Sequence, residues 1–154
     1  MEVVFNIPHL FHPGVPPSEN AEGLRVLLDT LIALDMYFLR NHAARPLYAS
    51  GVVYARTDDW ETIPALYADS YHGTDKPMSN HPVRYGKFGD CKSLTAAFVA
   101  ENRLRGNPCF PEFRFSAMGG GENLFHILVR TPRGFEDPSA RLGMGKDELR
   151  WFGL

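Results

Sequence analysis

The chain has 154 residues, 44% of them apolar and 12% aromatic, with 16 Lys and Arg against 18 Asp and Glu for a net charge of −2. These values are typical of one globular domain over residues 1–154 and argue against a two-domain protein. No cluster of Lys or Arg supplies the positive charge that a phosphate backbone attracts, so we expect no nucleic acid as a partner.

The sequence predicts neither an export signal nor a membrane segment. The N-terminus carries Glu2 and two prolines, whereas a secretory signal needs an apolar stretch there. The most apolar region, residues 24–39, is interrupted by charged side chains at Arg25, Asp29 and Asp35. We therefore expect no membrane partner and a cytoplasmic location in the producing cell.

The first half of the chain predicts one long helix. A short β-rich segment at residues 2–7 leads into a proline-rich loop through Pro17, which we expect to be non-helical. Residues 20–40 then carry apolar side chains about every 3.6 residues, the period of a helix with one buried face. This stripe comprises Leu24, Leu27, Leu28, Leu31, Leu34 and Phe38.

A strand, a short helix and a long loop are expected next. Residues 48–56 are rich in β-forming side chains, which predicts a strand. Asp58 or Thr62 could cap a short helix that runs towards Tyr71. Residues 72–89 contain many His, Gly, Asn and Pro residues without periodicity, which predicts a loop of the length that often carries function.

A second helix is predicted to begin at Cys91. Asp90 is a favoured N-cap residue, so Cys91 would be the first residue of the helix. The helix should end at Gly106 and Pro108. Its expected buried stripe is Leu94, Ala97, Phe98 and Leu104.

Three strands are predicted after this helix. Residues 110–117 and 123–131 form the first two, joined by a hairpin at residues 119–121, and residues 135–137 form a short third strand. The order of helices followed by antiparallel strands predicts an α+β fold.

Cys91, His126 and Asp137 are the candidate catalytic residues. The positive end of a helix dipole favours a thiolate at Cys91, so we expect a lowered thiol pKa and a nucleophilic, partly exposed sulfur. Nucleophilic catalysis also needs a base and a group that orients the base, and His126 and Asp137 supply those types. We expect the sulfur to face His126 across a cleft between helix and sheet. Cys109, in contrast, should be a buried and unreactive thiol.

The pairing of two strands brings His126 and Asp137 together in either of two registers. If Thr131 and Pro132 form the turn, Asp137 lies directly opposite His126. If Pro132 and Arg133 form the turn, Asp137 pairs with Leu128 and lies diagonal to His126, with roughly 7–8 Å between Cα atoms. Both registers leave the two side chains on one face of the sheet.

Each of these residues alone has a simpler structural interpretation. A cysteine at a helix start is often a small packed residue, a strand histidine is often a hydrogen-bonded polar group, and an aspartate before proline is often part of a turn. The functional interpretation depends on all three occurring together in the order Cys, His, Asp.

Three segments resemble the transglutaminase-like superfamily, in particular its small phage-encoded members. They are GDCKS (89–93), which opens an alanine-rich helix, FHILV (125–129) and FEDPS (135–139). The resemblance covers about residues 85–144 and implies a papain-like core, in which a helix that carries the nucleophile packs on an antiparallel sheet. It also implies that Cys91 is the nucleophile, His126 the general base and acid, and Asp137 the residue that orients His126.

The resemblance implies acyl transfer through a Cys91 thioester, as a thiol protease or amidase or as a transglutaminase, on a peptide or protein amide and without a cofactor or metal. Lys92 stands where relatives often have an acidic residue, and Ile127 where many have a small one. Tyr85 and Trp60 are the candidates for a second oxyanion donor, although packing roles are the simpler interpretation for both.

The sequence is also compatible with two other functions. The chain could be a virion or assembly protein that binds virion proteins through a papain-like scaffold without turnover. Alternatively, Cys91, His126 and Asp137 could bind zinc as three ligands of suitable type. His9 and His12 lie in a proline-rich loop without a nearby acidic or thiol ligand, so two surface imidazoles are the simpler interpretation there.

Overall fold

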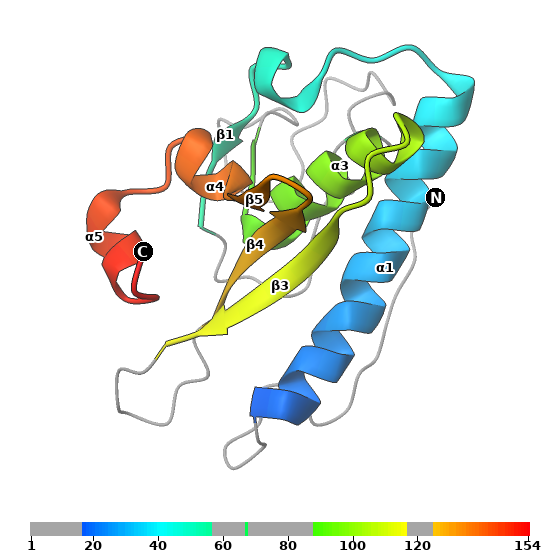
Figure 1. The fold of residues 1–154 in the computed structure, drawn as a ribbon. Helices are drawn as coiled ribbons and strands as arrows, with labels where there is room; N and C mark the ends of the chain where they lie inside the picture. The colour runs from blue at the N-terminus through cyan, green and yellow to red at the C-terminus, as the bar shows by residue number, and fades with distance from the viewer. Residues whose placement is uncertain (1–16, 57–66, 68–87, 117–124) are drawn as a thin grey trace, which may run out of the picture.

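A computed structural model describes residues 17–56, 67, 88–116 and 125–154 (Figure 1). Helices and strands are mixed, and three of the strands form an antiparallel sheet, as expected of an α+β fold. The elements in chain order are α1 (Pro17–Asn41), the 3₁₀ turn η1 (Leu47–Ala49), β1 (Val53–Tyr54), β2 (Phe88–Gly89), α3 (Cys91–Leu104), β3 (Phe110–Phe115), β4 (Phe125–Thr131), β5 (Gly134–Glu136), α4 (Pro138–Arg141) and α5 (Lys146–Arg150).

The long helix α1 confirms the prediction for residues 20–40 and is somewhat longer. Pro17 was expected in a loop but begins the helix, because the first helical position needs no backbone N–H and suits the fixed φ of proline. The buried face of α1 packs along α3 and reaches β3. In the described part of the chain, no helix combines the length and the apolarity needed to cross a bilayer.

The strand predicted at residues 48–56 is largely wrong. Residues 47–49 form η1, where the Ser50 hydroxyl donates to the Leu47 carbonyl at 2.6 Å, and Gly51 follows with a φ of +83°. This local hydrogen bond and the left-handed glycine produce a turn instead of an extended chain. Only Val53–Tyr54 are a strand, paired in parallel with Phe88–Gly89.

The parallel pair β1–β2 leads directly into the second helix. Its second strand lies at the end of the segment 72–89 that was predicted to be a loop. The β-rich segment 2–7, the predicted helix from residue 58 or 62 to Tyr71 apart from Tyr67, and the hairpin at 119–121 lie outside the described residues.

Helix α3 begins where the sequence predicted. Asp90 is its N-cap, and its Oδ1 accepts hydrogen bonds from the backbone N–H groups of Lys92 at 2.9 Å and Ser93 at 3.3 Å. Leu94 and Ala97 are buried as expected. Leu104 is 37% exposed, which contradicts its predicted burial, because it ends the helix in a stretch exposed from residue 104 to residue 108.

The three-stranded sheet has the order β3-β4-β5 with both pairs antiparallel. The strands are close to the predictions, with β3 ending at Phe115 and β5 one residue earlier than expected. Thr131 pairs with Gly134, so Pro132 and Arg133 occupy the turn, which is the second of the two registers considered.

The main core lies between this sheet and the two long helices (Figure 1). Ile127 and Val129 project from β4 into a cluster with apolar side chains of α1 and α3. Cys109 is 1% exposed within the same cluster and its thiol is free, which confirms its predicted burial. Cys91 belongs to this cluster too.

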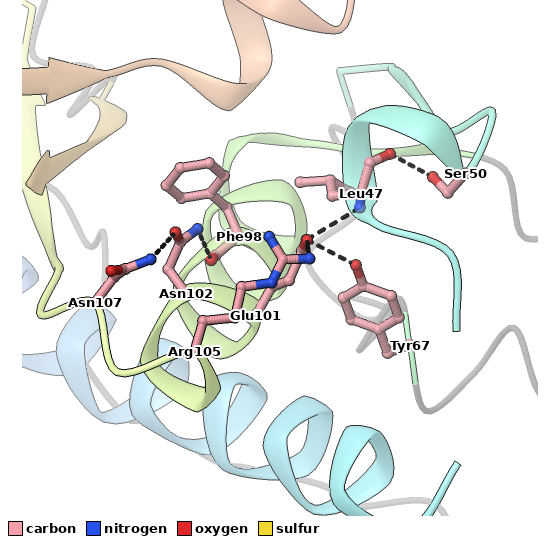
Figure 2. Close-up of polar contacts among 8 residues, drawn as sticks. All are labelled: Leu47, Ser50, Tyr67, Phe98, Glu101, Asn102, Arg105 and Asn107. Carbon is pink, nitrogen blue, oxygen red and sulfur yellow. Dashed lines mark hydrogen bonds and ion pairs between the residues drawn. The ribbon is translucent and has the colours of Figure 1, made fainter. Parts of the chain in front are cut away.

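Glu101, near the C-terminal end of α3, anchors the chain ahead of β1 to that helix (Figure 2). Its Oε2 accepts hydrogen bonds from the Leu47 backbone N–H at 3.0 Å and from the Tyr67 hydroxyl at 2.9 Å. Arg105 forms an ion pair with its other oxygen at 2.5 Å. This cluster fixes η1 against α3, and η1 leads into the β1–β2 pair from which α3 starts.

Candidate active site

Cys91 is the first residue of α3, as predicted, but it is buried. Its exposed fraction is 8%, so the expected partial exposure is wrong. The residue sits in the main core cluster while its backbone N–H is at the helix position where no intrahelical acceptor exists.

The first turn of α3 docks against the edge of β4 beyond the end of β5. The β4–β5 pairing stops at Val129 and Glu136, so β5 does not extend alongside Ile127. The Thr95 hydroxyl donates to the Ile127 carbonyl at 3.5 Å, and a backbone hydrogen bond from Ile127 reaches the Cys91 thiol. The sulfur therefore lies beside the residue that directly follows His126.

His126 and Asp137 form a hydrogen-bonded pair. His126 Nε2 lies 2.9 Å from Asp137 Oδ2, and the imidazole is 1% exposed. The register places Asp137 one step beyond the Val129–Glu136 pair, diagonal to His126, as one of the two alternatives predicted. Because Nε2 faces the carboxylate, Nδ1 is the ring nitrogen left for a proton exchange with a thiol.

Asp137 holds its position through a second set of contacts. It is the N-cap of α4, where Oδ1 accepts the backbone N–H of Ala140 at 3.0 Å. One carboxylate oxygen thus caps a helix while the other orients the imidazole. The turn role and the orienting role considered for Asp137 are both present, and the cap makes the orientation of the carboxylate rigid.

Burial raises the pKa of the Cys91 thiol to about 12, which contradicts the expected lowering by the helix dipole. Desolvation is the largest cause, and the neighbouring Asp90 carboxylate adds to it, while Lys92 opposes the rise. Asp137 also raises this pKa, which places its charge within electrostatic reach of the sulfur. In this arrangement the sulfur carries its proton at neutral pH.

A C-terminal segment covers the site, and we call residues 145–154 the C-terminal cover. The ring of Phe152 lies 5.4 Å from the ring of His126. The Tyr54 hydroxyl, on the strand that pairs with Gly89, donates to Glu148 Oε1 at 2.7 Å. Burial and this bond raise the pKa of Tyr54, so the hydroxyl stays a donor.

Sequence reasoning did not identify Tyr54, Glu148 or Phe152 as neighbours of the site. Their spacing along the chain gives no signal, because they meet only through tertiary packing. Trp60, Tyr85, His9 and His12 lie outside the described residues, so no second oxyanion donor is placed.

The zinc alternative gains no support from the geometry. Within residues 17–56, 67, 88–116 and 125–154, no three His, Cys, Asp or Glu side chains converge as metal ligands would. Cys91, His126 and Asp137 lie in that part of the chain. The structure shows instead a hydrogen-bonded imidazole and carboxylate, with the Cys91 thiol at the backbone of Ile127.

Comparisons with protein-family models, with curated proteins and with solved structures found no match to this chain.

Proposed function

We propose that this chain is a cysteine-dependent acyl-transfer enzyme with a papain-like or transglutaminase-like core. The observation that carries the proposal is the His126–Asp137 pair at 2.9 Å, together with a cysteine that begins a capped helix and whose thiol is hydrogen-bonded by the backbone of Ile127, the residue after His126. A thiol, an imidazole and an orienting carboxylate are the three groups that such chemistry requires. The substrate class is a peptide or protein amide.

The reaction uses His126 as a base first and as an acid second. Nδ1 of His126 removes the proton from Cys91 as the sulfur attacks the amide carbonyl carbon, which forms the carbon–sulfur bond. The backbone N–H of Cys91 is placed to donate to the resulting oxyanion. The intermediate then expels the amine, which takes the proton from His126, and a thioester remains on Cys91.

The raised pKa of Cys91 favours this concerted removal of a proton over a pre-formed thiolate. Asp137 keeps Nε2 as the donor nitrogen and stabilises the imidazolium that forms during attack. The thioester is finally transferred to water, as in a thiol protease or amidase, or to an amine, as in a transglutaminase.

The test is to trap and count the thioester. Short peptide amides and activated esters are incubated with the protein, the products are separated with and without added primary amine, and the intact protein is weighed by mass spectrometry. An acyl adduct on Cys91 that is released as acid or as amide supports the proposal and identifies the acceptor.

Two cysteine variants provide the controls. Cys91→Ser should abolish the adduct and the turnover without unfolding the chain, because a hydroxyl is tolerated at the first helical position. Cys109→Ser should leave both unchanged, because Cys109 is remote from His126 within the core. Turnover that survives Cys91→Ser, or no adduct with any donor, would favour a binding scaffold such as a virion or assembly protein.

A further inference from the structure

The side chain of Lys92 is buried beside the proposed nucleophile. The residue is 4% exposed, and its ammonium group forms an ion pair with the Asp90 carboxylate, which is buried as well. The same ammonium lies 5.7 Å from the centre of the Phe125 ring, one residue before His126. Lys92 therefore connects the start of α3 to the start of β4.

A buried lysine at this position is costly for stability. Lysine is among the residues least often buried, and a buried ion pair commonly contributes little net stability because both ions lose their hydration. The first seven residues of α3 are all buried, so the charge at its second position is enclosed by the protein. The ion pair with Asp90 therefore has to offset the cost of enclosing the ammonium group.

The capping residue has two effects on the start of α3. A carboxylate at Asp90 caps α3 well, but it places a negative charge next to the sulfur of Cys91. In a site with little water, this charge opposes the formation of negative charge on sulfur. An ammonium group against the same carboxylate cancels most of that field without disturbing the cap, because the backbone N–H groups bind Oδ1 and Lys92 pairs with Oδ2.

We propose that Lys92 is a positioning residue for Cys91, which neutralises the Asp90 carboxylate so that the capped start of α3 can carry a developing thiolate. This inference takes Cys91 as the nucleophile and in that sense rests on the proposed function. Among the described residues, the other ionisable groups near the sulfur are Tyr54 from β1, His126 from β4 and Asp137 after β5, with Glu148 of α5 behind Tyr54.

The direction of the charge effects on Cys91 supports the proposal. Asp90 raises the pKa of the thiol and Lys92 lowers it. The two residues act on the sulfur with opposite sign, as a neutralising pair must.

The experiment measures the rate of Cys91 alkylation by iodoacetamide against pH, with mass spectrometry to separate Cys91 from Cys109. Lys92→Met should raise the apparent pKa of Cys91 by about one unit or more and slow its alkylation at pH 8 about tenfold. Asp90→Asn with Lys92→Met should return the profile close to that of the wild type, because asparagine keeps the cap without the charge. Lys92→Arg keeps the charge and should preserve the profile.

Two controls separate this effect from loosening of the fold. Arg40→Met removes an exposed cation near the end of α1, outside the C-terminal cover, and should leave the profile unchanged. Cys109 labelling within the same molecules should stay slow, because it reports opening of the core rather than charge near Cys91.

The proposal is overturned if Lys92→Met does not change the pH profile of Cys91 alkylation. It is also overturned if Cys91 of the double variant is alkylated as slowly as in Lys92→Met. If Lys92→Met does not fold, the double variant still decides, because it removes both charges of the Asp90–Lys92 pair. A profile about one unit above that of the wild type would then contradict the proposal. Alkylation does not require turnover, so a shifted profile without any acyl adduct would refute the proposed function alone. An adduct without a shift would refute the role of Lys92 alone.

Discussion

At the scale of single residues, Asp137 has the most constrained position in the site. Its two oxygens serve different partners, the backbone N–H of Ala140 and the imidazole of His126. A substitution can therefore remove one function and keep the other. Substitutions of Asp137 can therefore change catalytic activity and the stability of the fold by different amounts.

Asp137→Asn should keep the fold and part of the activity, while Asp137→Ala should lose much of both. Asparagine caps helices about as well as aspartate and can still contact the imidazole, so we expect a stability loss within about 1 kcal/mol. Alanine removes the cap and leaves a buried imidazole unpaired, which should cost about 2–3 kcal/mol and lower acyl transfer at least about a hundredfold. Chemical denaturation and thioester formation measure the two effects.

One result with the Asp137→Asn and Asp137→Ala variants would refute the role of Asp137 in orienting His126. If both variants lose activity only in proportion to their loss of stability, Asp137 is a fold residue that caps α4. The Arg141→Ala variant, which changes the same helix at a largely exposed residue, serves as the control.

For single residues, the sequence predicts the features that neighbouring residues determine and misses those that depend on residues far along the chain. The Asp90 cap and the first helical position of Cys91 follow from neighbouring residues, and so does the alternation that places His126 and Asp137 on one sheet face. The burial of Cys91 depends on β4 and on residues far along the chain, which no local pattern encodes. The expected lowering of the Cys91 pKa is wrong, because desolvation by burial raises that pKa.

At the scale of elements, α1, α3 and the three antiparallel strands were predictable. Their periodicity, their caps and their turns are properties of contiguous sequence. The pair β1–β2 was not predictable, because each strand has two residues and exists only through pairing across more than thirty positions of the chain. The 3₁₀ turn at Leu47–Ala49 replaced a predicted strand because local hydrogen bonds prevailed over β propensity.

The anchor at Glu101 should be the most sensitive polar contact between elements. Glu101→Ala would remove the carboxylate that accepts from the buried Leu47 N–H and from the Tyr67 hydroxyl, so we expect a loss of about 2–4 kcal/mol in unfolding free energy. Tyr67→Phe removes one of these bonds and should cost about 1 kcal/mol. Chemical denaturation of both variants measures the difference, and equal losses would show that Leu47 contributes nothing to the anchor.

At the scale of the whole molecule, the proposed catalytic groups come from three separate parts of the fold. Cys91 begins a helix, His126 lies on the central strand of the sheet and Asp137 follows its edge strand. The C-terminal cover contacts His126 through Phe152 and Tyr54 through Glu148. The short helix α5 has no buried residue and no side-chain cap, so its attachment should be among the weaker ones in the fold.

Because this attachment is weak, we expect the cover to limit the access of reagents to Cys91 and to contribute little to the free energy of unfolding. Phe152→Ala removes the ring beside His126, and Tyr54→Phe removes the hydroxyl that holds Glu148. We expect each variant to increase alkylation of Cys91 several-fold, on the order of three to ten, and to lower the unfolding free energy by only about 1 kcal/mol, since local opening does not require global unfolding.

Alkylation of Cys109 separates local from global opening in the same measurement. Cys109 lies in the main core, so its labelling should stay at the rate of the wild type in both variants. Trp151 is the half-buried neighbour of Phe152 in the cover, and Arg56 lies 5.7 Å from its indole ring. Arg56→Gln is therefore a matched substitution that should change Cys91 labelling less than Phe152→Ala. A parallel rise at Cys91 and Cys109 would contradict a local cover, because both thiols would then be exposed by unfolding of the core.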